Sequence, residues 1–433
     1  MKKLLLVLLL GYASSYAQTQ IGTDIDGEAA DDESGRSVSL SSDGTIVAIG
    51  AYGNDGSGSN AGSVRVYKNI SGTWTQIGAD INGEAAGDYS GRSVSLSSDG
   101  TIVAIGAPDN DGSGSNAGSV RVYQNIAGTW TQIGADINGE ASGDKSGRSV
   151  SLSADGTIVA IGAYGNDGSG TDAGSVRVYK NTTGTWTQIG ADINGEATDD
   201  WSSWSVSLSS DGTIVAIGAL FNDGSGTDAG SVRVYKNIAG TWTQIGADIN
   251  GEVADDYSGY SVSISSDGTI VVIGALQNDG SVADAGSARV YQNESGIWTK
   301  RGADIDGEAA DDYSGYSVSL SSDGTIVAIG AYGNNGNGSN AGSVRVYDLA
   351  AVLSSDSFVH ANFLLYPNPT NGVLNIALQN NLQVEKVNFY NPLGQLVKTA
   401  TTHLITTSEL AKGSYFVEVI TTQGKATKKV LVQ

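Results

Sequence analysis

One 56-residue unit, repeated six times without insertion or deletion, fills most of this chain. A second string, Thr-Gln-Ile-Gly, stands once ahead of any complete unit, and the sixth unit ends without it. This offset predicts a ring in which the N-terminal strand completes the last unit and leaves no open strand edge. An Asp-Gly pair marks the copies, with its aspartate at Asp43, Asp99, Asp155, Asp211, Asp267 and Asp323. The second string begins at Thr19, Thr75, Thr131, Thr187 and Thr243 and returns as Thr-Lys-Arg-Gly at Thr299.

Each unit has the pattern of four short antiparallel strands. In the second unit we expect strands over residues 75–81, 93–97, 101–106 and 119–123, and the segment 101–106 is apolar on both faces. Six such units predict an all-β chain built on a six-bladed β-propeller closed by the N-terminal strand. A solenoid is the alternative, but solenoids need distinct caps at both ends, whereas these two ends complement each other.

The two ends of the chain differ from the repeats. Two lysines, an apolar run over residues 4–10 and a small-x-small site predict a signal peptide over residues 1–17. The propeller is then expected over residues 18–348 and a linker over residues 349–362. Residues 363–433 alternate in short stretches between Gly, Pro and Asn turns, which predicts a small C-terminal β-sandwich. No later segment reaches about 18 apolar residues, so we expect no transmembrane segment.

Charge is distributed unevenly along the chain. Residues 18–350 hold 42 acidic and 15 basic residues, a net charge of −27, whereas the tail from Tyr366 onward holds six lysines and three glutamates. Binding to DNA or RNA requires a positive surface that neutralises phosphates. The charge of the repeat region therefore excludes a nucleic-acid partner.

Three strings in the units carry a family resemblance. Ser-Gly-Arg-Ser-Val-Ser-Leu-Ser, Ile-Val-Ala-Ile-Gly-Ala-Pro at 102–108 and Gly-Ser-Val-Arg-Val-Tyr resemble FG-GAP repeats in their bacterial form, the blades of integrin-α-like propellers. The resemblance implies a propeller fold for all six units. The calcium-holding loop of that family, Asp-x-Asp-x-Asp-Gly, is reduced here to an Asp-Gly turn. The family's Phe is replaced by Ser34, Ser90, Ser146, Ser202, Ser258 and Ser314.

The tail resembles a second family. The strings Leu-Tyr-Pro-Asn-Pro at 365–369, Val-Asn-Phe-Tyr-Asn-Pro-Leu-Gly-Gln-Leu-Val at 387–397 and the ending Lys-Val-Leu-Val-Gln are similar to the type A C-terminal sorting domain of the type IX secretion system. The resemblance implies that the type IX machinery is a partner of the tail. It also implies a protein that is secreted or attached to the outer cell surface of a Gram-negative bacterium.

Side chains commonly used in catalysis are scarce in the repeat region. Residues 18–350 contain no histidine and no cysteine, so the usual general base and thiol nucleophile are missing. Paired carboxylates can cleave glycosides, but near-identical units offer near-identical environments, whereas acid and base roles need different ones. We therefore assign no catalytic residues and expect that the chain is not an enzyme.

Most acidic residues lie in two long loops of each unit, which emerge on the same face of a propeller. Carboxylates ionised at neutral pH attract divalent cations, and calcium is the cofactor that suits them. The alternative is an acidic surface that only solvates the protein. The expected ligands are the adjacent pairs Asp199 and Asp200, Asp255 and Asp256, and Asp311 and Asp312.

The six units differ most in sequence at two positions just before the strand that corresponds to residues 93–97 of the second unit. One position reads Arg36, Arg92, Arg148, Trp204, Tyr260 and Tyr316, and three residues earlier the units read Glu33, Tyr89, Lys145, Trp201, Tyr257 and Tyr313. Aromatic faces stack on sugar rings while nearby carboxylates accept hydrogen bonds from hydroxyl groups. The alternative is sequence drift at a half-exposed packing position. The candidate ligand-binding residues are Trp201, Trp204, Phe221, Tyr257, Tyr260, Tyr313 and Tyr316.

These features together predict an adhesin-like binding protein. Its acidic loop face would engage an extracellular glycan or protein. A structural component of the surface layer without a specific ligand is the alternative. A carboxylate-based glycan hydrolase is the third and weakest candidate.

Overall fold

The computed structural model describes residues 20–353, 363–378, 383–392, 394–421 and 424–433. The expected signal peptide lies outside these residues. The described part is built almost entirely of strands, and its single helix is α1 (Ala350–Leu353). No helix in these ranges is long and apolar enough to cross a membrane.

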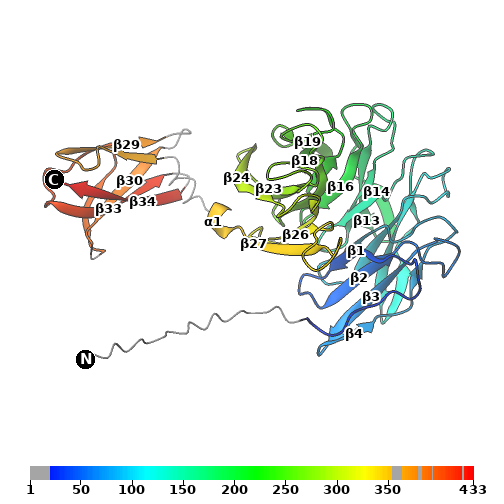
Figure 1. The fold of residues 1–433 in the computed structure, drawn as a ribbon. Helices are drawn as coiled ribbons and strands as arrows, with labels where there is room; N and C mark the ends of the chain where they lie inside the picture. The colour runs from blue at the N-terminus through cyan, green and yellow to red at the C-terminus, as the bar shows by residue number, and fades with distance from the viewer. Residues whose placement is uncertain (1–19, 354–362, 379–382, 393, 422–423) are drawn as a thin grey trace, which may run out of the picture.

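Units 1 to 4 each fold into one antiparallel sheet, the blade of a β-propeller. The order in unit 1 is β1-β2-β3-β4, and β5 also pairs with β3. The strand expected over residues 75–81 at the start of the second unit is thus divided between β4 and β5 and belongs to the sheet of blade 1. Figure 1 shows the blades following one another from blue unit 1 to yellow unit 6. The strands of unit 1 are β1 (Ser34–Leu40), β2 (Ile46–Ala51), β3 (Ser63–Ile70), β4 (Thr73–Gln76) and β5 (Ile81–Asn82). Those of unit 2 are β6 (Ser93–Leu96), β7 (Ile102–Ala107), β8 (Ser119–Ile126), β9 (Thr129–Gln132) and β10 (Ile137–Asn138).

Units 3 and 4 repeat this arrangement strand for strand. Unit 3 contains β11 (Ser149–Leu152), β12 (Ile158–Ala163), β13 (Ser175–Thr182), β14 (Thr185–Gln188) and β15 (Ile193–Asn194). Unit 4 contains β16 (Ser202–Leu208), β17 (Ile214–Ala219), β18 (Ser231–Ile238), β19 (Thr241–Gln244) and β20 (Ile249–Asn250).

The last two units have fewer strands. In unit 5 the outer segment is one long strand, whereas in unit 6 the sheet has only three strands. Unit 5 contains β21 (Ser258–Ile264), β22 (Ile270–Ala275), β23 (Ser287–Glu294) and β24 (Ile297–Asp306). Unit 6 contains β25 (Ser314–Leu320), β26 (Ile326–Ala331) and β27 (Ser343–Asp348).

The core of the propeller lies between neighbouring blades. The second strand is buried on both faces, as its apolar sequence predicts, and one cluster joins Val64 and Val66 of blade 1 to Leu96, Val103 and Ile105 of blade 2. Polar contacts also repeat at this interface. The Leu96 amide donates to Ser39 Oγ at 2.9 Å, and the Trp130 indole donates across the blades to the Ile77 carbonyl at 2.7 Å. The repeated tryptophans are therefore structural.

The interface between blade 6 and blade 1, which would close the ring, differs from the five other interfaces between neighbouring blades. Val344 is 68% exposed on blade 6 and Leu40 is 58% exposed on blade 1, whereas their equivalents Val64 and Leu96 are 0% and 7% exposed. Residues 20–25, which we expected to form the fourth strand of blade 6, form no strand with β27.

The N-terminal segment nevertheless contacts blade 1. The Trp74 indole donates to the Ile21 carbonyl at 2.8 Å, and the Arg65 guanidinium donates to the Asp26 carbonyl at 2.8 Å. Trp130 and Arg121 of blade 2 make the same two bonds to Ile77 and Asn82. Pairing of the N-terminal segment with β27 is absent among the described residues, so the expected closure is incomplete there.

The linker begins later than we expected. Leu349, the first residue of the expected linker, is buried with Val290 and Ile329, and its amide donates to the Thr325 carbonyl at 2.7 Å. Helix α1 follows, with Val352 packed against the same cluster. The segment 349–353 therefore belongs to the propeller, because its apolar side chains cover the outer part of the last blades.

The tail forms two antiparallel sheets around one core. The orders are β28-β29-β32 and β31-β30-β33-β34. Phe363 and Leu374 of the first sheet pack in one cluster with Phe389 and Val417 of the second. The strands are β28 (Phe363–Tyr366), β29 (Val373–Leu378), β30 (Val384–Tyr390), β31 (Leu396–Ala400), β32 (Leu404–Thr406), β33 (Gly413–Thr421) and β34 (Gly424–Val432).

Candidate binding site at the propeller channel

The first strands of all six blades line one cavity of about 800 Å³. The position at which the units disagree lies on its wall in every blade. The residues are Arg36, Arg92, Arg148, Trp204, Tyr260 and Tyr316. Half of the wall is therefore cationic, from blades 1 to 3, and the other half is aromatic, from blades 4 to 6. We call this cavity the channel.

In blades 4 to 6, the residue three positions before the aromatic wall residue has an unusual backbone conformation. Trp201, Tyr257 and Tyr313 have φ angles of 48°, 53° and 52°, in the left-handed region that residues other than glycine rarely adopt. Hydrogen bonds fix this conformation, since the Trp201 amide donates to the Asp172 carbonyl at 3.1 Å and the Trp204 amide donates to the Trp201 carbonyl at 3.2 Å. In blade 4 the turn places the Trp201 ring against the Trp204 ring, which lines the channel.

The aromatic rings form a continuous belt across blades 4 to 6. Trp201 stacks on Trp204 with centroids 5.6 Å apart, and Phe221 lies edge-on to Trp201 at 4.7 Å. Trp204 continues to Tyr260 at 5.8 Å, and Tyr260 to Tyr316 at 5.0 Å.

The other two expected residues join the same belt. Tyr257 contacts Phe221 at 5.4 Å, and Tyr313 stacks on Tyr332, which in turn contacts Tyr316 at 4.7 Å. The structure thus brings all seven candidate ligand-binding residues together. Their role in binding a ligand stays a prediction.

Sequence reasoning missed two members of the belt. Tyr164 packs on Trp201 at 4.9 Å and on Trp204 at 5.4 Å, and Tyr332 links Tyr313 to Tyr316. Both follow the Gly-Ala at the end of a second strand, where the units also differ. That variation was the signal that could have identified them.

Arginines adjoin the aromatic belt at both of its ends. The Arg148 guanidinium lies 3.9 Å from the centroid of the Trp204 ring, and that of Arg36 lies 5.5 Å from the Tyr316 ring. Burial, together with the positive charge of Arg92, lowers the pKa of Arg148 to about 10. Arg148 therefore stays charged at neutral pH in a place that disfavours its charge.

A second cavity of about 390 Å³ adjoins the channel and shares Arg92, Arg148 and Trp204 with it. Lys145 lines this cavity and pairs with Asp109 at 2.7 Å. The space available to a ligand thus extends from the channel toward blades 2 and 3.

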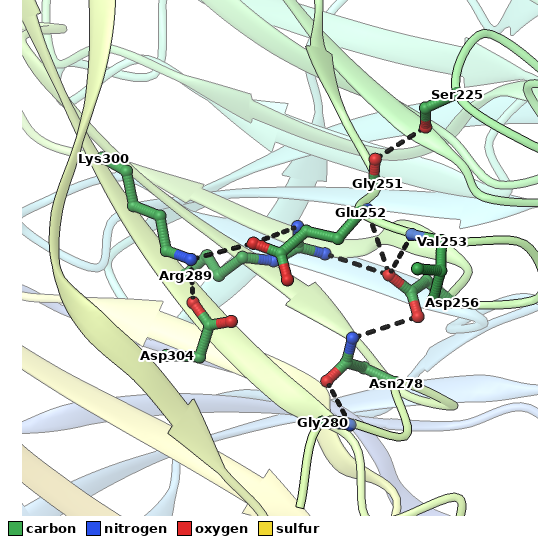
Figure 2. A network of polar contacts seen from close by, with 10 residues as sticks. All are labelled: Ser225, Gly251, Glu252, Val253, Asp256, Asn278, Gly280, Arg289, Lys300 and Asp304. Carbon is green, nitrogen blue, oxygen red and sulfur yellow. Dashed lines mark hydrogen bonds and ion pairs between the residues drawn. The ribbon is translucent and has the colours of Figure 1, made fainter.

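The paired aspartates have two different environments. Asp256 is buried and accepts hydrogen bonds from the amides of Glu252 and Val253 at 3.1 Å and from Asn278 Nδ2 at 3.0 Å, and Figure 2 shows this network with Arg289 beside it. Asp200 and Asp312 are buried with equivalent partners. These three carboxylates hold their loops in place.

The other member of each pair points outward. Asp199, Asp255 and Asp311 are exposed and have φ angles of 64°, 67° and 63°. Within the described ranges, no three histidine, cysteine or acidic side chains gather in a way that could hold a metal ion. Calcium binding by the six aspartates remains a prediction.

Solved structures with a similar fold include proteins of several kinds. Hydrazine synthase of Kuenenia stuttgartiensis has a TM-score of 0.51 at 14% identity, over 78% of this chain and 82% of that chain. A candidate 6-phosphogluconolactonase from Bacteroides uniformis has a TM-score of 0.49 at 14% identity, over 72% and 80%. The periplasmic gluconolactonase of Pseudomonas aeruginosa has a TM-score of 0.47 at 14% identity, over 86% and 87%. At these identities the likeness concerns the fold alone.

These structures correct one expectation drawn from the sequence. We expected that the chain is not an enzyme because residues 18–350 lack histidine and cysteine. Hydrazine synthase, a protein named as an enzyme, has a similar fold. The expectation was wrong as drawn, because carboxylates, tyrosines and arginines around a cavity can also transfer protons or stabilise charge.

The families of the two regions are shown by sequence. No protein of curated function matches the chain. The FG-GAP repeat matches residues 17–67, 82–123, 138–179 and 305–347, and the secretion system C-terminal sorting domain matches residues 364–433. This sorting domain marks proteins exported by type IX secretion, so the protein is secreted or attached to the outer cell surface of a Gram-negative bacterium. The chain therefore carries FG-GAP repeats followed by a secretion system C-terminal sorting domain.

Proposed function

We propose that this exported protein is an adhesin-like binding protein that engages an extracellular glycan through the aromatic belt at the channel. The observation that carries the proposal is the belt itself, in which rings from three neighbouring blades touch one another around a cavity of about 800 Å³. Such a volume lies within the range of roughly 300–1,000 Å³ of small-molecule sites.

The chemistry of the belt suits carbohydrates. Aromatic faces offer apolar area to the C–H side of a sugar ring, and phenol hydroxyls and nearby carboxylates can hydrogen-bond its hydroxyl groups. Trp204, Tyr260 and Tyr316 are each only half buried, so their rings still have surface to offer. A protein partner that inserts an aromatic or polar loop would use the same surface.

A glycan array with the chain lacking residues 1–17 tests the proposal, followed by calorimetry on the best ligand. We expect Trp204→Ala to weaken binding at least tenfold, because stacking on an aromatic ring is lost. Tyr366→Ala, which removes an exposed aromatic ring in the tail, is the matched control and should bind as the parent does. Product analysis on the same ligands detects turnover. Silence on glycans and on extracellular matrix proteins would overturn the proposal.

A structural component of the surface layer is the second candidate. The observation in its favour is the exposed apolar surface of blade 6, where Val344 and Val346 are 68% and 63% exposed. Self-association in sedimentation experiments that survives loss of Trp201 and Trp204 would support this candidate. A monomer at all accessible concentrations would exclude it.

A further inference from the structure

We propose that the channel selects acidic saccharides, with the arginines of blades 1 to 3 taking the carboxylate or sulfate and the aromatic residues of blades 4 to 6 taking the sugar ring. This inference rests on the proposed function and names the class of ligand. The two halves of the channel wall carry the argument.

The arginines of the channel wall are unusual in this acidic repeat region. Residues 18–350 carry a net charge of −27, yet Arg36, Arg92 and Arg148 form no ion pair with any carboxylate in the described part of the chain. The arginines of the third strands differ, since Arg121, for example, lies 3.7 Å from Glu84. Glu33 also lines the channel, and its carboxylate accepts a hydrogen bond from the Tyr52 hydroxyl. Three arginines against one carboxylate leave an excess of positive charge around the cavity, which favours an anion.

Two of these arginines lie against aromatic rings of the belt. Arg148 lies over the Trp204 ring at 3.9 Å, and Arg36 lies 5.5 Å from the Tyr316 ring. A guanidinium that stacks on a ring keeps the N–H groups at its edge free to bind an anion in bidentate fashion. The stacked arginine and the belt therefore present an anion site and a ring site next to each other. A sugar ring that bears an acidic group matches both.

Neutral sugars and long polyanions match the charges of the channel less well. A neutral sugar would leave the half-buried Arg92 and Arg148 without a counter-charge, and burial already lowers the pKa of Arg148 to about 10. A long polyanion such as a nucleic acid would meet the acidic loops around the channel, among them Asp199 and Asp255, which are exposed. A short acidic saccharide would meet fewer of those carboxylates, although Glu33 and Asp109 also line the two cavities.

Calorimetry with trigalacturonate, a sulfated galactan trisaccharide and neutral galactotriose tests the inference and separates carboxylate from sulfate. We expect one acidic probe to bind at least about tenfold more tightly than galactotriose. Arg148→Gln and Arg92→Gln should each remove most of that preference, measured as the ratio of the affinity for the acidic probe to the affinity for galactotriose. Lys180→Gln, which removes an exposed positive charge on β13, is the matched control and should keep the preference.

Each outcome decides between the two proposals. Equal affinity for acidic and neutral probes, unchanged in Arg148→Gln, would overturn the inference while leaving saccharide binding in place. No binding to any probe or array glycan would overturn the proposed function as well. Melting curves of the variants establish that they are folded. Arg148→Lys keeps the charge but loses the bidentate edge, so it should retain only part of the preference.

Discussion

Adjacent aspartates in the same loop have different tasks in this protein. Asp200 is buried and accepts hydrogen bonds from the Ala197 amide at 3.0 Å and from Asn222 Nδ2 at 3.1 Å, whereas Asp199 is exposed. Asp200→Ala would leave a buried amide and a buried donor without partners, so we expect a loss of about 1–3 kcal/mol in the free energy of unfolding. Asp199→Ala should change it by less than about 0.5 kcal/mol. Urea unfolding of both variants measures the difference, and equal losses would contradict it.

Calcium provides a second test of the same residues. If the loops bind calcium only when folded, each site at a hundred times its Kd adds about 2.7 kcal/mol of stability. Melting temperature should then rise with millimolar calcium by more than with sodium chloride of the same ionic strength. The rise should shrink in a variant with Asp199, Asp255 and Asp311 all changed to Asn. Equal effects of the two salts would show that calcium only screens charge.

The Asp-Gly turns make stability depend on acidity. Hydrogen bonds from the Thr45 amide, the Ser41 hydroxyl and the Thr45 hydroxyl lower the pKa of Asp43 to about 2. Because the folded pKa lies below the unfolded value, this stabilisation is complete above about pH 4 and is lost as the pH falls toward 2. In Asp99 the pKa is also lowered, because hydrogen bonds from Ser97 and Thr101 outweigh partial burial.

Other carboxylates shift in the opposite direction. Burial raises the pKa of Glu84, Glu140 and Glu196, so their contribution to stability is greater at low pH and is lost as the pH rises through the folded pKa. We therefore predict that stability increases slightly from pH 7 to about pH 5 and falls steeply below pH 4. Denaturant midpoints across this range test the profile. A midpoint that stays constant down to pH 2.5 would contradict it.

At the scale of elements, backbone atoms determine how closely neighbouring blades can approach each other. A Cβ added to Gly106 of β7 would lie 2.0 Å from the Gly147 carbonyl oxygen of blade 3. Gly106→Ala therefore has to push two blades apart, and we expect it to destabilise the fold by about 1–3 kcal/mol. Gly336→Ala is the control, because its Cβ would approach only the Asn334 side chain, at 3.1 Å. Similar melting temperatures of the two variants would show that the blades adjust freely.

At the scale of the whole molecule, we predict that blade 6 packs on blade 1 and that the N-terminal strand completes the contact. Val38, Leu40, Val344 and Val346 are exposed by 58% or more, although their equivalents at the other interfaces are largely buried. Burying a valine or leucine side chain stabilises by roughly 1.5–3 kcal/mol. Deleting residues 19–25 should therefore lower the melting temperature by several degrees. A change within a degree or two would mean that the ring is not closed by this strand.

Cysteine cross-linking tests the same closure directly, since the chain has no cysteine of its own. At each of the five observed interfaces, a serine hydroxyl in the first strand of one blade accepts a hydrogen bond from a backbone amide in the first strand of the next blade. Ser39 Oγ, for example, accepts from the Leu96 amide. The pair Ser39→Cys with Leu96→Cys is the positive control. The pair Ser319→Cys with Leu40→Cys should form a cross-link to the same extent if the ring closes, and none if it does not.

Much of the fold follows from neighbouring residues and could be read from the chain. Alternation in Ser93–Leu96, the double-faced apolar run Ile102–Ala107 and the Asp-Gly turns specify blades locally, because strand period and turn chemistry act over a few residues. The helix α1 was not foreseen, because its formation depends on the cluster around Leu349 that receives it.

The sequence by itself determined the repeats, the propeller, the sorting tail and the variable position that carries the candidate site. Only the tertiary structure decided that Trp204, Tyr260 and Tyr316 share one cavity with three arginines, and that Tyr164 and Tyr332 extend the belt. It also decided that Asp200 faces inward and Asp199 outward, which identical residue types cannot reveal. The physical reason is the sequence separation of the interacting residues, because the hydrogen bonds and the strand periodicity of a blade depend on near neighbours in sequence. The channel, in contrast, joins side chains from blades up to 280 residues apart, as Arg36 and Tyr316 show.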